Sequence, residues 1–347
     1  MTVDKMRFAV LTKAKVAEVH ERPLPEMDEN QILIKQEACN ICTTDYGQWL
    51  GLREHQPYPM AGGHEGAGVI VKKGSKVRDD LNIGDRVAVT YGYCGECGPC
   101  KSGATSECTQ YESGPTEDGY YGNFGFADYC VRDSRVLIKM DKGLSASEAS
   151  FLEPLATVAK GLRKLRIKPL ETVVVIGAGT MGVVNAQAAR AYGCRVIITE
   201  VMEEKIKAAK SMGFEVINAN ECDPVEKVKA LTNGEGADAV VVAVGITRAN
   251  EQALDMVKRV EGRILLFAAG YPAPKLEIDS NYIHYKKLEL IGTYGADMQD
   301  FVISAKLLNE RRVDVSKLIQ ATYPLDKIQE AYGEASKPGS YRVSVLL

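Results

Sequence analysis

The chain has 347 residues, of which 45% are hydrophobic and 26% are charged, and its formal net charge is −3. Because domains typically have about 100–200 residues, this length predicts two domains. The nearly neutral charge offers no electrostatic attraction for nucleic acid, and no apolar run reaches the roughly 18–20 residues that span a bilayer. The first ten residues lack the pattern of a secretory signal. We therefore expect a cytoplasmic protein that binds neither nucleic acid nor membranes.

The N-terminal part of the chain is predicted to consist of short strands and turns. Segments rich in alternating or continuous apolar residues are bounded there by Gly, Pro, Asn and Asp. The predicted strands lie at 6–11, 17–25, 31–39, 66–74 and 85–92. This pattern indicates a mostly-β domain with long functional loops.

Four of the nine cysteines follow these strands within a fifteen-residue window, at Cys94, Cys97, Cys100 and Cys108. In a cytosolic chain we expect reduced thiols, so clustering indicates a metal rather than disulfides. Four thiolates on one short loop are typical of a closed, tetrahedral zinc site with a structural role. Redox-active cysteines are the alternative, which the compact spacing disfavours.

The pattern changes near residue 154, where apolar runs begin to alternate with helical segments. The predicted strands lie at 172–177, 195–200, 214–218, 238–245, 263–270 and 288–295. The predicted helices between them lie at 180–193, 202–213, 223–234 and 247–260. Continuous Val/Ile strands separated by helices indicate a parallel sheet covered on both faces. We expect the doubly wound, dinucleotide-binding architecture.

The tail is predicted to form one helix at 299–312 and a last strand at 340–347, and to return to the first domain. The fold class is therefore α/β, with a mostly-β domain and a doubly wound parallel sheet. The expected domains are 1–154 and 155–290, with 291–347 as the returning segment.

A glycine motif follows the first strand of the second domain. Gly177, Gly179 and Gly182 form a G-x-G-x-x-G that also contains Thr180 and Met181. Since the motif follows a strand and opens a helix, it predicts a loop whose backbone approaches a pyrophosphate. The alternative is a glycine turn in the same fold that binds another ligand.

Glu200 ends the next predicted strand, eighteen residues after the motif. A carboxylate at that place accepts hydrogen bonds from the adenosine ribose and repels the 2′-phosphate of NADP. Val201 and Met202 follow it, so no arginine stands there to bind that phosphate. The sequence predicts NAD as the cofactor.

A second set of candidate metal ligands is dispersed over the first domain. Cys42, His64 and Glu153 would supply one thiolate, one imidazole and one carboxylate. A catalytic zinc keeps three protein ligands and one open position. Each residue alone is better explained as an ordinary core or capping residue. Together, beside the four-cysteine loop and the glycine motif, they indicate a second zinc.

The order of these motifs resembles that of the zinc-dependent medium-chain dehydrogenases of the alcohol, sorbitol and threonine dehydrogenase type. Cys-x-Thr-Asp (42–45), Gly-His-Glu (63–65), Gly-Asp-Arg-Val (84–87), the four cysteines, Glu-Pro-Leu (153–155) and the glycine motif follow one another as they do there. The Glu-Pro-Leu version is similar to the polyol branch. The resemblance implies a GroES-like catalytic domain, a Rossmann domain and two zinc ions per chain.

The resemblance also implies roles for individual residues. Cys42, His64 and Glu153 would bind the catalytic zinc, and Glu65 would lie next to the metal and ligate it transiently or through water. Thr44 would relay the proton of the alcohol, and Asp45 would orient His64. The implied reaction transfers a hydride from a secondary alcohol to NAD and leaves a ketone.

Several positions depart from the family pattern or leave the substrate open. Gly47 stands where polyol dehydrogenases usually carry a histidine, so the proton needs another exit. The candidate pocket residues are Gln48, Trp49, Phe124 and Tyr294. Threonine-like amino alcohols and phosphorylated polyols remain alternative substrates. A zinc-free reductase and a non-catalytic NAD-binding protein are the rival classes.

The predicted strand at 263–270 is expected at or near the edge of the second sheet. An apolar edge invites pairing with the same strand of another copy. We therefore expect a homo-oligomer, a tetramer in preference to a dimer.

Overall fold

The computed structural model describes residues 4–111 and 114–347, which divide into two compact units. Unit 1 extends to Ala156 and resumes at Ala296–Leu347, and unit 2 is Thr157–Gly295. The sequence analysis placed the two boundaries between these units at 154/155 and 290/291. In the described residues, every helix is too short or too polar to cross a bilayer.

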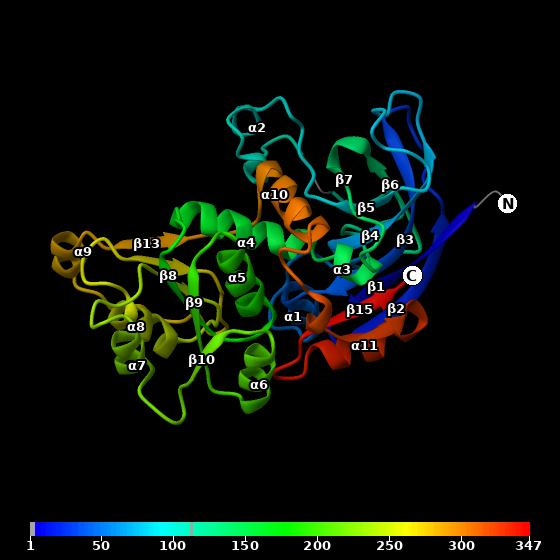
Figure 1. The fold of residues 1–347 in the computed structure, drawn as a ribbon. Helices are drawn as coiled ribbons and strands as arrows, with labels where there is room; N and C mark the ends of the chain where they lie inside the picture. The colour runs from blue at the N-terminus through cyan, green and yellow to red at the C-terminus, as the bar shows by residue number, and fades with distance from the viewer. Residues whose placement is uncertain (1–3, 112–113) are drawn as a thin grey trace. The chain divides into compact units, whose positions relative to one another are not determined.

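Unit 1 is built mainly of β-strands, as expected (Figure 1). The strands before the crossing to unit 2 are β1 (Lys5–Lys13), β2 (Val16–Pro23), β3 (Gln31–Ile41), β4 (Glu65–Lys73), β5 (Arg86–Val89), β6 (Tyr129–Asp133) and β7 (Leu137–Lys139). The short helices among them are α1 (Thr43–Trp49), α2 (Gly98–Lys101) and α3 (Ala146–Ala149), and α4 (Leu152–Leu165) continues into unit 2. The returning segment adds α10 (Met298–Asn309), β14 (Ile319–Pro324), α11 (Ile328–Ala335) and β15 (Arg342–Leu346).

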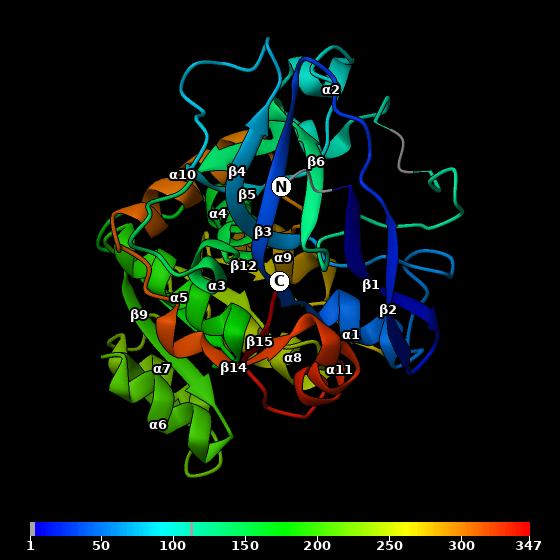
Figure 2. The same ribbon diagram turned by 90° about the vertical axis from the view of Figure 1, so that its right-hand side faces the viewer.

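Strand β3 lies at the centre of the unit 1 sheet. The sheet has the order β14-β15-β3-β4-β5-β7, and β6 also pairs with β3. Figure 2 shows β3 between β4 and β6. Both β15 and β4 are antiparallel to β3, with Val343 opposite Ile41 and Asn40 opposite Glu65. This register brings the start of β15 and the start of β4 to the end of β3, where Cys42 follows.

Unit 2 contains the six-stranded parallel sheet that the sequence predicts. Its strands are β8 (Thr172–Ile176), β9 (Arg195–Glu200), β10 (Glu215–Asn218), β11 (Ala239–Val242), β12 (Arg263–Leu266) and β13 (Glu289–Gly292). Its helices are α5 (Thr180–Ala191), α6 (Glu203–Ser211), α7 (Pro224–Leu231), α8 (Thr247–Met256) and α9 (Ser280–Lys286). The order β10-β9-β8-β11-β12-β13 is the strand order of doubly wound dinucleotide-binding folds.

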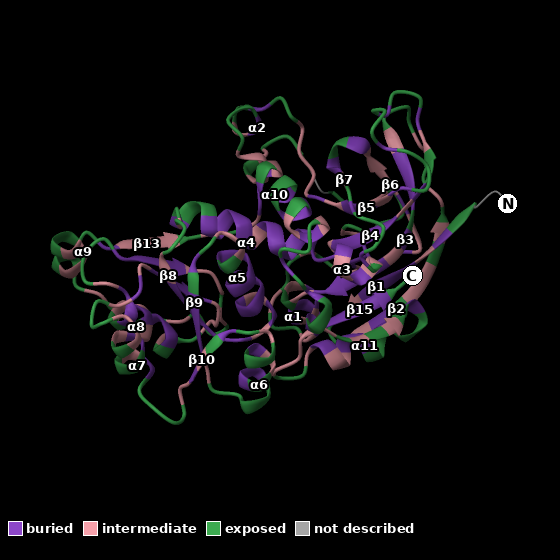
Figure 3. Ribbon diagram, in the orientation of Figure 1, coloured by how far each residue is buried: buried purple, intermediate pink, exposed green. Residues whose placement is uncertain are grey.

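Helices cover this sheet and make its strands the core of unit 2. The helices α7 and α8 contact each other and share a hydrophobic cluster with the strands, while α5 and α6 pack along β8, β9 and β10. The middle strands β8 and β11 are buried along nearly their whole length. Figure 3 shows this burial for β8. Burial of both faces explains the continuous Val/Ile runs in the sequence.

Candidate functional site

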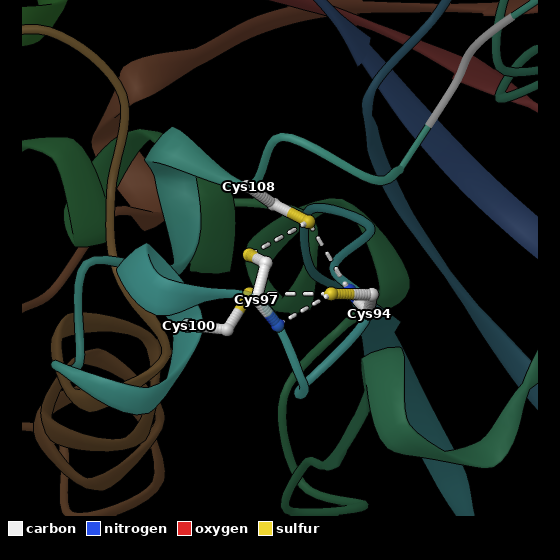
Figure 4. Close-up of side chains that lie close together, drawn as sticks. All are labelled: Cys94, Cys97, Cys100 and Cys108. Carbon is white, nitrogen blue, oxygen red and sulfur yellow. Dashed lines mark hydrogen bonds between the residues drawn. The ribbon is translucent and has the colours of Figure 1, made fainter.

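The four-cysteine loop folds into a compact tetrathiol cluster. The four side chains converge (Figure 4), and the Sγ–Sγ distances Cys94–Cys100 and Cys97–Cys108 are both 3.9 Å. These distances are too long for disulfides. Zinc–sulfur bonds of about 2.3 Å in a tetrahedron would hold sulfurs about 3.8 Å apart, so the cluster fits zinc without rearrangement.

Backbone N–H groups stabilise the metal-binding form of the cysteines. The N–H groups of Glu96 and Cys97 both donate to Sγ of Cys94 over 3.3 Å. Hydrogen bonds from the backbone of Cys100 and Thr109 lower the pKa of Cys97 to about 6. Thiolates are the form that binds metal, so this environment favours the charged ligand.

The cluster is attached to helix α10 at its beginning. Both the backbone N–H and the hydroxyl of Ser106 donate to Oδ1 of Asp297, over 3.0 and 2.9 Å. The hydroxyl of Thr105 accepts from the N–H of Met298 over 2.8 Å. The loop therefore fixes the point at which the chain re-enters unit 1.

We expect Cys100→Ala to lose one zinc per chain and to lower the melting temperature, because structural zinc contributes directly to folding free energy. Zinc content and thermal unfolding would be measured together. The exposed Cys222 provides the control, since Cys222→Ala removes a thiol outside either metal set. Two zinc ions and an unchanged melting temperature in Cys100→Ala would contradict the assignment.

A second metal-binding set lies at the end of β3. Ligand atoms of Cys42, His64 and Glu65 all lie within 4.8 Å of one another. Cys42 directly follows β3, and His64 directly precedes β4, so the antiparallel register brings the two motifs together. One thiolate, one imidazole and one carboxylate form a donor set that suits a catalytic zinc.

Asp45 holds this set in place. Its carboxylate accepts hydrogen bonds from the N–H of Cys42 over 2.9 Å and of Gly63 over 3.2 Å, and Oδ1 lies 3.6 Å from Nδ1 of His64. Burial alone would lower the pKa of His64, but the Asp45 and Cys42 charges outweigh it and raise that pKa well above its usual value. The surroundings are thus electronegative and suited to a cation.

Arg342 is a site residue that the sequence reasoning missed. Its side chain donates to both carboxylate oxygens of Glu65, over 2.9 Å from Nε, and its Nη2 lies 3.7 Å from Sγ of Cys42. Both Glu65 and Arg342 are buried. Arg342 is the first residue of β15, and strand pairing alone places it opposite the end of β3. No motif in the sequence identifies it as a site residue.

Glu153 lies outside the tight three-residue set but close to it. It is buried at the start of α4, and its Oε1 accepts a hydrogen bond from the hydroxyl of Tyr91. Burial raises the pKa of Glu65 to about 7, Arg342 opposes this shift, and Glu153 adds to it. Arg342 therefore contacts Glu65 and Cys42, and Glu153 lies close enough for its charge to act on both Glu65 and Arg342.

The glycine motif forms the predicted turn between β8 and α5. Gly177 has φ +101°, and a Cβ on Gly182 would lie 2.0 Å from the Gly177 carbonyl oxygen, so both positions require glycine. Gly179 precedes α5, and the space beside it is open. Thr180 and Met181 form the first turn of this helix, and helix N-termini commonly bind phosphate groups.

Glu200 lies beside this turn. Its Oε2 accepts from the N–H of Ala178 over 2.7 Å, and its Oε1 accepts from Val201 and Met202 over 2.7 and 2.9 Å. Lys205, which the sequence reasoning missed, is buried in α6. Burial lowers the pKa of Lys205 to about 8, and the charge of Glu200 opposes that shift.

The candidate pocket residues are mostly engaged in packing. The Gln48 amide holds the loop beside it, donating to the Gln56 carbonyl over 2.6 Å and accepting from His55 over 3.1 Å. Trp49 stacks on Tyr332 with ring centroids 6.0 Å apart.

Phe124 packs against Phe8 in a separate hydrophobic cluster. Tyr294, in unit 2, is 80% exposed. These contacts give Trp49 and Phe124 a packing role, and the substrate pocket stays a prediction.

Comparison with known proteins agrees with this geometry. Residues 28–142 match the alcohol dehydrogenase GroES-like domain, and residues 180–310 match the zinc-binding dehydrogenase family. A sorbitol dehydrogenase from Halalkalibacterium halodurans is 32% identical over 339 residues, covering 95% of this chain and 94% of the relative. An L-threonine 3-dehydrogenase from Shewanella oneidensis is 30% identical, covering 90% of this chain and 91% of the relative.

A solved structure is also similar over the full length. A protein of Sinorhizobium meliloti, described as a zinc-binding dehydrogenase bound to NADP, aligns with a TM-score of 0.87 at 25% identity, covering 99% of this chain and 100% of that one. The chain therefore belongs to the zinc-dependent alcohol dehydrogenases, with a GroES-like domain, a Rossmann domain for NAD or NADP, and separate structural and catalytic zinc sites.

Proposed function

We propose that this chain oxidises a secondary alcohol of the polyol class to the ketone and transfers the hydride to NAD⁺. The observation that carries the proposal is the cluster of Cys42, His64 and Glu65 in electronegative surroundings at the end of β3. In this proposal residues 1–154 hold both zinc ions, residues 155–290 hold NAD, and residues 291–347 return to complete the first domain.

Cys42, His64 and Glu153 are the proposed zinc ligands, and Glu65 is the neighbouring carboxylate that Arg342 holds. Zinc bound there would polarise the substrate hydroxyl as a Lewis acid and lower its pKa. Asp45 lies beside Nδ1 of His64 and orients its ring, which is a common role for the outer partner of a ligating histidine. Arg342 keeps Glu65 beside Cys42 through its hydrogen bonds to the carboxylate.

Thr44 is the proposed acceptor of the substrate proton. It is half-buried in the first turn of α1, two residues after Cys42. One helical turn later, a Cβ on Gly47 would lie 3.8 Å from the side chain of Arg53, so the Arg53 stem covers this face of α1. Arg53 Nη2 lies 3.4 Å from Nδ1 of His55. The loop at 53–55 therefore borders the path by which the proton leaves.

The names of the relatives support the polyol class. The Halalkalibacterium relative is a sorbitol dehydrogenase. A relative from Escherichia coli, 28% identical over 95% of each chain, is an L-galactonate-5-dehydrogenase. The Shewanella relative acts on threonine, and a 26% identical relative from Enterococcus avium acts on D-arabitol phosphate. All four names describe the oxidation of a hydroxyl group on a short, polar carbon chain.

A substrate panel tests the proposal. The zinc-loaded protein would be mixed with NAD⁺ and with sugar alcohols, inositols, threonine, hydroxysulfonates and phosphorylated polyols, and NADH formation would be followed. We expect the highest kcat/KM for a neutral polyol. A preference for threonine or a phosphorylated polyol would favour those alternatives. No NADH from any compound, with two zinc ions bound, would favour a non-catalytic NAD-binding protein.

We also propose a homo-oligomer. Strand β12, whose sequence suggested an edge, pairs with β11 and β13, so it lies one strand inward. The edge strands of the described sheet are β10 and β13, and β13, the neighbour of β12, carries half-buried Leu290 and Ile291. Pairing of β13 with its copy would cover this edge. Light scattering should give four times 37.8 kDa. A mass of 37.8 kDa at micromolar concentration would exclude an oligomer.

A further inference from the structure

Glu153 is a buried carboxylate that needs a partner to hold its direction. It is 5% exposed and is the second residue of helix α4. The neighbouring buried charges are already paired, since Arg342 donates two hydrogen bonds to Glu65. A glutamate side chain has three rotatable bonds, so a carboxylate aimed at a metal loses much conformational freedom unless another group fixes it first.

Tyr91 supplies such a group. It follows β5 and lies three residues before Cys94, the first cysteine of the structural site. Its ring packs edge to face against Phe301 of α10, with centroids 5.2 Å apart and an interplanar angle of 85°. Phe301 is buried, so this contact fixes the ring. The hydroxyl at the end of the ring donates to Oε1 of Glu153.

The chemistry of the donor suits a ligating carboxylate. A phenol stays neutral at physiological pH, so it orients Glu153 without cancelling the negative charge that a zinc ion requires. A lysine or arginine at the same place would form an ion pair and compete with the metal. Because one oxygen of Glu153 is engaged by Tyr91, the other oxygen is left for a different partner.

We propose that Tyr91 is a positioning residue for the catalytic metal site, because its hydroxyl holds Oε1 of Glu153 and so fixes the direction of this carboxylate. This inference rests on the proposed role of Glu153 as the third zinc ligand. In this proposal Tyr91 acts on the metal site through the carboxylate of Glu153. Tyr91 also links the two zinc sites. Its side chain contacts Glu153, and the backbone continues over three residues to Cys94 of the tetrathiol cluster.

The test is Tyr91→Phe, which keeps the ring and its packing on Phe301 and removes only the hydroxyl. Removal of an outer partner of a metal ligand typically weakens metal binding by roughly 10–100-fold. We expect that loss for the catalytic zinc in chelator competition, with the structural zinc retained. After Co²⁺ replaces the catalytic zinc, the visible absorption spectrum should also shift, because the carboxylate is no longer held.

Tyr120→Phe is the matched control. It also removes one phenolic hydroxyl from unit 1, but that hydroxyl lies 2.9 Å from Nδ1 of His20 and away from both metal sets. We expect it to change neither zinc affinity nor the Co²⁺ spectrum. Equal effects of the two substitutions would overturn the inference, because a general loss of stability would explain both.

A double-mutant cycle with Glu153→Ala separates this inference from the proposed function. If Tyr91 acts through Glu153, Tyr91→Phe should have no further effect on zinc affinity in the Glu153→Ala background. Additive effects would overturn the inference, as would a result in which Glu153→Ala weakens zinc binding and Tyr91→Phe leaves it unchanged. If Glu153→Ala leaves the catalytic zinc as tightly bound as in the unsubstituted protein, then Glu153 is not a ligand and that part of the proposed function also fails.

Discussion

Cys42→Ala is expected to abolish turnover while the protein keeps its fold and one of its two zinc ions. The substitution removes the only thiolate of the catalytic set. Lewis-acid activation contributes several kcal/mol of transition-state stabilisation, and each ~1.4 kcal/mol is a factor of ten, so we expect a loss of at least about a thousandfold. The hydrogen bond that begins α1 comes from the backbone N–H of Cys42 to Asp45, and alanine preserves it.

The measurement combines steady-state NADH formation with elemental analysis of zinc. Cys130→Ala is the matched control, because Cys130 is equally a thiol of unit 1 but lies in a hydrophobic cluster outside both metal sets. It should retain two zinc ions and near-normal turnover, with some loss of stability from the small cavity. Full turnover by Cys42→Ala would refute the catalytic role of this zinc site.

The contrast between the two metal sites shows what the sequence could predict. The four structural cysteines lie on one loop, so their spacing alone determines which sulfurs can meet. The spacing of residues could not predict the catalytic set, because Cys42 and His64 meet only through the pairing of β3 with β4. The motifs identified these residues by resemblance, and the strand register supplies the physical reason for their proximity.

Arg342 and Tyr91 could not be found in the same way. Arg342 contacts a site 300 residues earlier in the chain, and its place depends on the pairing of β15 with β3. Tyr91 follows β5 and contacts Glu153, which lies 62 residues later in the chain at the start of α4. Neither residue belongs to a spaced motif, so only the topology could reveal them. Topology was also needed for Gln48, which the sequence analysis named as a candidate pocket residue. Its side-chain amide holds the loop at 55–56.

Some elements were also beyond the patterns in the sequence. Helix α11 has only eight residues and includes Gly333, so its apolar periodicity is too short to stand out. Strand β14 alternates between half-buried and exposed residues at the edge of its sheet. The Val/Ile strands of unit 2 were predictable because burial on both faces leaves a continuous apolar run in the sequence.

A preference for NAD of roughly a hundredfold is the second large effect that we expect, and Glu200 is its proposed cause. The carboxylate ends β9 and binds the glycine turn through the N–H of Ala178. A 2′-phosphate within a few ångströms would meet a repulsion on the order of a few kcal/mol at an effective dielectric near 20, and each ~1.4 kcal/mol is tenfold in affinity. Lys205 opposes this repulsion in part, because its side chain is close enough to sense the charge of Glu200.

Two substitutions separate the charge of Glu200 from its backbone contacts. A carboxylate offers about four acceptor positions, and three are used by the N–H groups of Ala178, Val201 and Met202, which leaves one on Oε2 for a ribose hydroxyl. Glu200→Ser should lower kcat/KM for NAD⁺ and reduce the preference for NAD⁺ over NADP⁺, because it removes both the charge and these contacts. Glu200→Gln keeps an acceptor of the same length, so it should narrow the preference with a smaller loss for NAD⁺.

Neither variant should become an efficient NADP enzyme. Lys205 is buried, and without the charge of Glu200 beside it the pKa of this amine should fall below its value of about 8, so it would be a weaker cation for the 2′-phosphate. The decisive measurement is the ratio of kcat/KM for NAD⁺ and NADP⁺ in the unsubstituted protein and in both variants. Comparable values for the two cofactors before substitution would show that Glu200 does not face the ribose, and the NAD assignment would then be wrong.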